Sequence, residues 1–125
     1  MAVTLNLKGF LVLIHPNALE YTSFGKPNPS VFRNAENVLM ETVPSSYQLA
    51  NHVTGGNHVF RTLYMIGDNP SVDIKGAMQA GHPWFSILTR TGVFKGKENH
   101  AEHPADLVVD TVEEAVDYIF RKEGM

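Results

Sequence analysis

Apolar residues recur at helical spacing shortly after residue 28 and form one stripe along a helix. The residues of this stripe are Val31, Phe32, Ala35, Val38 and Leu39. Asn28 can cap such a helix with its side chain. Pro29 suits the first helical position, where a missing N–H costs no hydrogen bond. The pattern predicts an amphipathic helix that begins near Pro29 and ends before the Pro-Ser-Ser sequence at 44–46.

Three short apolar segments later in the chain are typical of buried strands. They run from Thr62 to Ile66, from Trp84 to Leu88 and from Ala105 to Val109. Turn-forming or charged residues bound each of them, so we expect three short strands separated by helices and loops.

A helix is predicted directly after the first of these strands. Asn69-Pro70 repeats the pattern of a capping residue followed by proline, and Gly81 is expected to end the helix as a left-handed cap. The residues expected to face the core are Ile74, Ala77 and Met78. Gly76 within this helix is expected to allow close approach to a neighbouring strand.

Thr111 and Glu114 have the spacing of a capping box, which predicts a last helix that begins near residue 112. From residue 25 onward, the predicted order is helix, strand, helix, strand, strand, helix. Strands that alternate with helices favour an α/β fold. We therefore predict a Rossmann-like partial core, with a parallel sheet flanked by helices.

The first twenty residues have a different pattern. Val3, Leu5 and Leu7 alternate with polar residues, and a continuous apolar run from residue 10 to 14 ends at a His-Pro pair. This is typical of one or two partly buried strands. We therefore expect the chain to divide into residues 1–20 and 21–125.

Composition narrows the class of protein without identifying a function. Of the 125 residues, 43% are hydrophobic and 18% are charged, which is ordinary for one soluble globular domain. The net charge is −3 and the basic residues are scattered, so no nucleic-acid surface is expected. The longest apolar run is far shorter than the ~20 residues that span a bilayer, so no membrane segment is expected. No targeting segment is visible, which leaves cytoplasmic and mitochondrial locations open.

Two carboxylates follow the first strand, at the edge where parallel α/β sheets bind their ligands. Gly67-Asp68 ends the strand, and Asp73 follows at the start of the next helix. Carboxylate oxygens suit a hard divalent cation such as Mg²⁺ beside a phosphate. Upstream, Lys26 lies in a Gly-Lys-Pro sequence ahead of a helix, where a lysine can neutralise a phosphoryl group. These residue types and positions indicate a metal and phosphate site.

The Gly-Lys-Pro sequence, followed by a strand ending in Gly-Asp and then Asp73, resembles the third and fourth motifs of the haloacid dehalogenase-like hydrolase superfamily. TSFGKP, MIGDNPSVDIKGAMQAG and PADLVVDTVEEAV are most similar to its p-nitrophenylphosphatase-like branch. The resemblance implies Mg²⁺-dependent hydrolysis of phosphate monoesters of small metabolites through an aspartyl-phosphate. The expected partner is then a phosphorylated small molecule.

The resemblance also implies a role for each candidate residue. Asp68 would ligate Mg²⁺, Asp73 would support the metal or hold the lysine, and Lys26 would be the catalytic lysine that stabilises phosphoryl charge. Asn69 and Arg90 are candidates for binding substrate, and Asn69 also for bonding metal-bound water. Each residue also has an ordinary structural interpretation. Asp68 and Asn69 can act as caps, Asp73 suits the first turn of a helix, and Lys26 can be a surface lysine. For Arg90, a solvent-exposed loop position is the favoured interpretation.

The family's nucleophile lies in a DxDx[TV] motif at the end of its first strand, and that motif does not occur in this sequence. Glu20 is the sole acidic residue before Lys26, and no carboxylate follows two residues later. Thr22 and Ser23 lie too close to Lys26 to serve as the second family motif.

The chain is therefore expected to correspond to the second half of a phosphatase core. Residues 21–125 would be its C-terminal part, and residues 1–20 a cap-domain remnant or an N-terminal strand. Two hypotheses follow: a truncated product or fragment of an enzyme, or a non-catalytic domain that acts as a binding or assembly module. Whether the chain is itself an enzyme stays open. A half-core is also expected to leave a sheet edge or face uncovered. We therefore expect either self-association or a first segment, Val3 to Ile14, that folds back to cover the gap.

Overall fold

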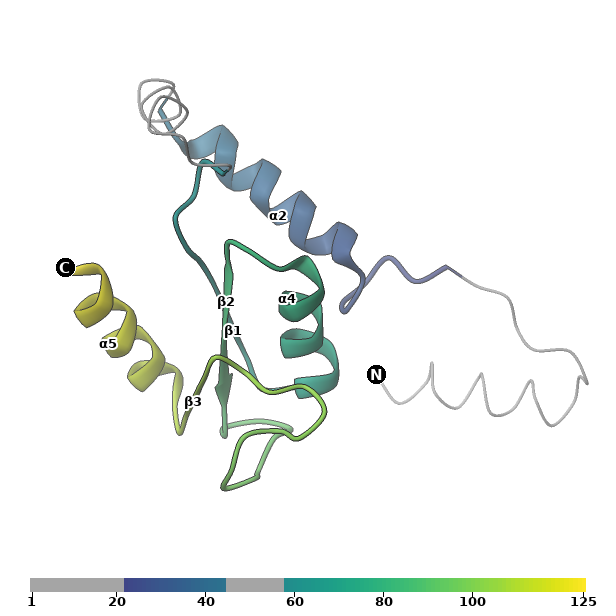
Figure 1. The fold of residues 1–125 in the computed structure, drawn as a ribbon, viewed down its shortest axis with the longest axis vertical. Coiled ribbons are helices and arrows are strands. Elements are labelled where there is room, and N and C mark those ends of the chain that lie inside the picture. Colours follow the sequence, from purple (N-terminus) through teal and green to yellow (C-terminus); the bar gives the residue numbers. More distant parts are fainter. Residues whose placement is uncertain (1–21, 45–57) are drawn as a thin grey trace, which may run out of the picture.

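The computed structural model describes residues 22–44 and 58–125, and Figure 1 shows their fold. The one or two strands expected within residues 1–20 lie outside the described residues. Within the described part, helices and strands follow one another in the predicted order.

Three parallel strands form the sheet in this part of the chain. β1 (Leu63–Gly67) pairs with β2 (Trp84–Thr89), and β2 pairs with β3 (Leu107–Val109), so the spatial order is β1-β2-β3. Gly67 lies opposite Leu88 in the register. Because the strands are parallel, the segments that follow them gather at one edge of the sheet. The predicted partial α/β core is confirmed, with strand bounds shifted by one or two residues.

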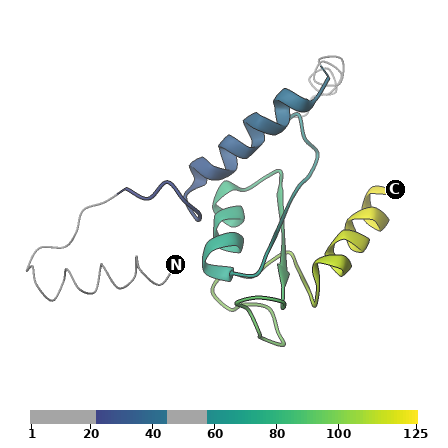
Figure 2. The ribbon, with the colours of Figure 1, turned by 180° about the vertical axis from the view of Figure 1, so that it is seen from behind.

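Helices lie on both faces of the sheet (Figures 1 and 2). α2 (Pro29–Thr42) and α4 (Lys75–Ala80) pack against each other, and α4 also contacts β2. α5 (Val112–Glu123) contacts β2 and β3 from the opposite side. A π-helical turn, η1 (Pro70–Ile74), leads directly into α4, which the sequence pattern does not predict. Among the described residues, no helix combines the length and hydropathy needed to cross a membrane.

Side-chain caps define where α2 and η1 begin. The Asn28 side chain accepts a hydrogen bond from the N–H of Ser30 at 2.9 Å. Asn69 accepts one from the N–H of Ser71 at 3.1 Å. Each cap satisfies a backbone donor that has no partner inside its helix. Both predicted caps are confirmed.

Two further helix ends agree with the sequence in outline and differ in detail. Thr111 Oγ1 accepts from the N–H of Glu114 at 3.2 Å, as in a capping box. The Glu114 carboxylate, however, accepts from the N–H of Asp110, one residue before the cap, at 2.8 Å. Gly81 ends α4 with a φ of 70°, but its ψ of −157° lies outside the left-handed helical region. The position is still one that favours glycine.

Phe32 attaches α2 to the rest of the fold. Its ring is 2% exposed and meets the Trp84 ring edge-on, with 5.1 Å between centroids. A Cβ at Gly76 of α4 would lie closer than 3.0 Å to atoms of the Phe32 ring. The predicted approach of Gly76 to a strand is therefore wrong, because the ring that fills this space comes from a helix.

Several apolar residues that the periodicity places on packed faces are exposed. Val38 and Leu39 are exposed because α2 has 14 residues and α4 has 6, so α2 extends past the helix that covers it. Met78 is 48% exposed, which makes its predicted core position wrong. It lies on the rim of a cavity near the amino ends of the strands, where solvent reaches it.

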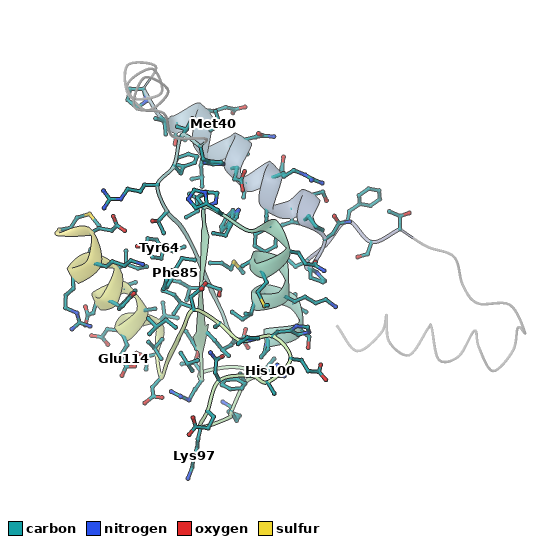
Figure 3. The ribbon with its side chains drawn as sticks, in the orientation of Figure 1. Met40, Tyr64, Phe85, Lys97, His100 and Glu114 are labelled. Carbon is teal, nitrogen blue, oxygen red and sulfur yellow. The ribbon has the colours of Figure 1, made fainter. Side chains whose placement is uncertain are left out.

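α5 is attached to the sheet by aromatic rings and one cation. Tyr64, Phe85 and Tyr118 make successive ring contacts, with centroids 5.7 and 5.9 Å apart. Lys122 Nζ lies 3.8 Å from the centroid of the Phe85 ring. Figure 3 places Tyr64 and Phe85 next to each other, on the side of the sheet where α5 lies. The Tyr64 hydroxyl donates to the Glu123 carboxylate. Burial, and then this hydrogen bond, raise the pKa of Tyr64 to about 12.

The contact between Gly76 and Phe32 predicts that Gly76→Val destabilises the fold. The added side chain overlaps a buried ring, so we expect a loss of about 1–3 kcal/mol in the free energy of unfolding. Gly25→Val is the matched control, since no atom lies within 4 Å of a Cβ at Gly25. Urea denaturation measures both variants, and equal stabilities would contradict this packing.

The raised pKa of Tyr64 predicts a loss of stability at alkaline pH. The folded chain holds this proton more tightly than the unfolded chain, where the pKa is 10.0. The contribution is therefore complete below about pH 10 and is lost as the pH rises towards about 12. Tyr64→Phe should lack this part of the pH dependence, and Tyr118→Phe should retain it. Urea titrations across this pH range measure the effect, and identical slopes for all three proteins would refute it.

Candidate functional site

The residues that the sequence singles out lie at the carboxyl edge of the sheet. Asp68 and Asn69 directly follow β1, and Arg90 directly follows β2, which runs parallel to it. Asp73 lies in η1, which begins beside the end of β1. Lys26 comes from the segment ahead of α2, far away in the sequence, and its side chain reaches Asp73.

Lys26 and Asp73 form an ion pair. Lys26 Nζ donates to Asp73 Oδ1; the Asp73 side chain is 6% exposed and that of Lys26 40%. Asp73 Oδ2 accepts from the N–H of Asn69 at 3.1 Å. Both oxygens of this buried carboxylate therefore have partners, which a charge in a low-dielectric site requires.

The end of β1 is shaped to accept the Asp73 carboxylate. A Cβ at Gly67 would lie closer than 3.0 Å to three atoms of the Asp73 side chain. Only a glycine at the last position of the strand leaves room for this carboxylate. The N–H of Asp73 donates to Asn69 O at 2.8 Å, so the first turn of η1 fixes the residue from its backbone as well.

The carboxylate of Asp68 is bound by a different segment, the loop that follows β2. Asp68 Oδ2 accepts from the N–H of Val93 at 2.5 Å. The backbone O of Asp68 accepts from the N–H of Phe94 at 2.9 Å. A Cβ at Gly92 would overlap the Asp68 carboxylate. The two carboxylates therefore have separate partners: Lys26 and the N–H of Asn69 for Asp73, and the N–H of Val93 for Asp68.

The donor set fits a hard divalent cation at Asp68 better than at Asp73. Asp68 Oδ1 accepts no hydrogen bond from the described residues, whereas both oxygens of Asp73 are occupied by Lys26 and Asn69. No group of three or more His, Asp or Glu side chains within ranges 22–44 and 58–125 is arranged to hold a metal. Asp68 would thus supply one protein ligand to a cation that keeps most of its waters, as Mg²⁺ does.

Asn69 and Arg90 have identifiable structural partners. The Oδ1 of Asn69 is used in capping η1. The Arg90 guanidinium donates to Gly96 O, Lys97 O and Asp110 Oδ1 at 2.6–2.8 Å, and its side chain is 28% exposed. The sequence favours a solvent-exposed loop position for Arg90; in the structure the residue lies in a loop, but its side chain is only partly exposed because it bonds to these three groups. Roles of these two residues in binding substrate stay predictions.

Sequence reasoning missed the loop that binds Asp68. Gly92 and the backbone N–H groups of Val93 and Phe94 contact this aspartate across 24 or more residues of sequence. The available signal was the Thr-Arg-Thr-Gly sequence directly after a strand, which indicates a tight loop at the ligand-binding edge. Backbone donors cannot be identified from side-chain types.

A cavity of about 370 Å³ lies elsewhere, near the amino ends of the strands. Its lining includes Arg61, His82, Trp84 and Lys122, and none of the five candidate site residues. Parallel α/β sheets bind their ligands at the carboxyl edge, which favours the residues around Asp68 and Asp73 over this cavity as the functional site.

The ion pair predicts a stability loss when Lys26 is replaced. Lys26→Met leaves the Asp73 carboxylate buried without its cation. We expect a loss of about 1–3 kcal/mol in the free energy of unfolding, less than for a fully buried pair because Lys26 is partly in water. Lys97→Met, at an exposed position, should have little effect. Urea denaturation of both variants, of Asp73→Asn and of the double variant Lys26→Met/Asp73→Asn tests this. Strict additivity in the double variant would argue against a direct interaction.

Comparison of the sequence with known proteins identifies relatives of this chain. The sequence profile of the HAD-hydrolase-like family matches residues 23–115. A cardiolipin synthase/mitochondrial hydrolase fusion protein of Schizosaccharomyces pombe is 37% identical over 105 residues, which cover 83% of this chain and 16% of that protein. A mitochondrial hydrolase of Saccharomyces cerevisiae is 40% identical over 57 residues, which cover 46% of this chain and 16% of that protein.

The phospholysine phosphohistidine inorganic pyrophosphate phosphatase of Rattus norvegicus is 31% identical over 119 residues, which cover 94% of this chain and 37% of that protein. The chain thus spans well under half the length of these relatives. The family match includes Lys26, Asp68 and Asp73, and it covers most of the residues that the structure describes. The chain therefore belongs to the HAD-like hydrolase family.

Proposed function

We propose that this chain forms the C-terminal part of the core of a Mg²⁺-dependent phosphatase that hydrolyses phosphate monoesters of small metabolites. The observation that carries this proposal is the Lys26–Asp73 ion pair beside Asp68, at the carboxyl edge of a parallel sheet. Lys26, held by the buried Asp73 carboxylate, is a positive charge in a fixed position. The Asp68 carboxylate of the same edge has Oδ1 available for a cation. Phosphate chemistry needs both kinds of group.

In this proposal each residue has a distinct role. Asp68 would hold Mg²⁺, which supplies Lewis acidity to a phosphoryl oxygen when bound. Lys26 would neutralise a second phosphoryl oxygen, and Asp73 fixes the position of the lysine ammonium. Asn69 would be a further donor toward substrate, because its Nδ2 donates to no group among the described residues. The names of the relatives, which include a phosphatase and a mitochondrial hydrolase, are consistent with this chemistry.

The attacking carboxylate of the proposed reaction is not assigned to this sequence, since the sequence contains no DxDx[TV] motif. We propose that residues of a longer protein, or a second chain that pairs with this one, supply it. The alternative is a non-catalytic domain that uses the same scaffold for binding or assembly. The two hypotheses differ in whether the site at Asp68 binds a cation, so the test measures cation binding.

Titration of the chain with Mg²⁺, followed by the amide NMR signals from Gly67 to Asp73, tests this proposal. With one protein carboxylate available, that of Asp68, we expect saturation with a Kd on the order of 1 mM. Asp68→Asn should weaken binding at least about tenfold, a difference of about 1.4 kcal/mol. Asp117→Asn, an exposed aspartate on α5, is the control and should leave the Kd unchanged.

Two results would overturn the proposal. Amide signals that do not respond to Mg²⁺ at tens of millimolar would favour the non-catalytic alternative. Saturation that Asp68→Asn leaves unchanged would show that the cation binds elsewhere.

A further inference from the structure

Arg90 begins the loop that holds Asp68, and its backbone is fixed by the sheet. The N–H of Arg90 donates to Val109 O at 3.1 Å, which continues the pairing of β2 with β3 by one residue. This hydrogen bond attaches the base of the loop to β3. The conformation of the loop beyond Arg90 depends on contacts within the loop itself.

The side chain of Arg90 folds back on the far end of the same loop. Its Nε donates to Gly96 O at 2.8 Å, and its Nη2 donates to Lys97 O at 2.6 Å. Its Nη1 donates to Asp110 Oδ1 at 2.6 Å, at the junction of β3 and α5. The guanidinium thus closes residues 90–97 into a ring and attaches the ring to the neighbouring strand. A planar fork suits adjacent carbonyls in a way that a lysine ammonium does not.

The opposite side of this ring faces Asp68. The N–H of Val93 donates to Asp68 Oδ2, and the N–H of Phe94 donates to Asp68 O. Phe94 also packs against the buried cluster of Ile74, Leu88 and Ala105. In Figure 3 the Lys97 side chain points away from the sheet, so the loop contributes backbone rather than this cation to the site.

We propose that Arg90 is a positioning residue. By closing the loop, it aims the N–H groups of Val93 and Phe94 at Asp68 and so fixes the carboxylate with Oδ2 bonded and Oδ1 available. Through this chain of contacts, Arg90 sets the geometry of the proposed cation ligand without touching the ligand's carboxylate. The part of this inference that concerns the cation rests on the proposed function, whereas the closure of the loop does not.

The first measurement is amide hydrogen exchange in Arg90→Gln and Arg90→Lys. Without the fork, the Val93 and Phe94 amides should exchange at least about tenfold faster than in the unmodified chain. The Leu88 amide in β2 reports on the stability of the sheet and should change much less. Arg121→Gln, an exposed arginine on α5, is the matched control and should change none of the three. Because lysine retains the charge near Asp110 but not the fork, Arg90→Lys should restore little of the protection.

The second measurement is the Mg²⁺ titration of the same variants. Arg90→Gln should raise the Kd about three- to tenfold, and Arg121→Gln should leave it unchanged. The proposal is overturned if Val93 and Phe94 keep their protection. It is also overturned if Leu88 loses protection to the same extent, since Arg90 would then stabilise the whole sheet.

Faster loop exchange with an unchanged Kd would overturn the link between the loop and the cation. If the unmodified chain binds no Mg²⁺ but the loop amides respond as expected, the proposed function fails and the closure of the loop by Arg90 stands.

Discussion

The buried carboxylate of Asp73 is the constraint around which this edge of the fold is arranged. Its side chain is 6% exposed, packs against Gly67 at the end of β1, and needs a partner for each oxygen. One partner is the N–H of Asn69, which the first turn of η1 supplies locally. The other is Lys26, which comes from the segment before α2 and brings that distant segment to the sheet edge. The glycine at position 67 is required by the same carboxylate.

The two aspartates at this edge of the sheet differ in their hydrogen-bond partners. Asp73 has both carboxylate oxygens bonded, one of them to Lys26, whereas the Asp68 carboxylate accepts one backbone N–H, from Val93, through Oδ2. A carboxylate that is oriented by neutral donors keeps its charge available to a cation, and a carboxylate paired with a lysine does not. This difference is why we propose a direct metal role for Asp68 and a supporting role for Asp73.

Membership of the HAD-like hydrolase family rests on the match of residues 23–115. Within the described part of the chain, the sheet contains three strands. The chain spans between 16% and 37% of the length of the relatives it matches. Phosphoryl transfer by covalent catalysis needs a nucleophile as well as charge stabilisation. The residues at this edge supply candidates for charge stabilisation, and the proposed function therefore depends on a carboxylate from elsewhere.

The sequence alone determined the order of helices and strands, the caps at Asn28 and Asn69, and the candidates Lys26, Asp68 and Asp73. These features follow from local periodicity, capping chemistry and short motifs, which are properties of neighbouring residues. The tertiary structure decided that Gly76 faces Phe32, that Met78 is exposed, and that the loop after β2 binds Asp68. The pairing of Arg90 with Asp110, just after β3, and of Lys26 with Asp73 on η1 was decided in the same way. Each of these outcomes depends on residues that are distant in the chain and on backbone atoms, whose positions exist only once the sheet has assembled.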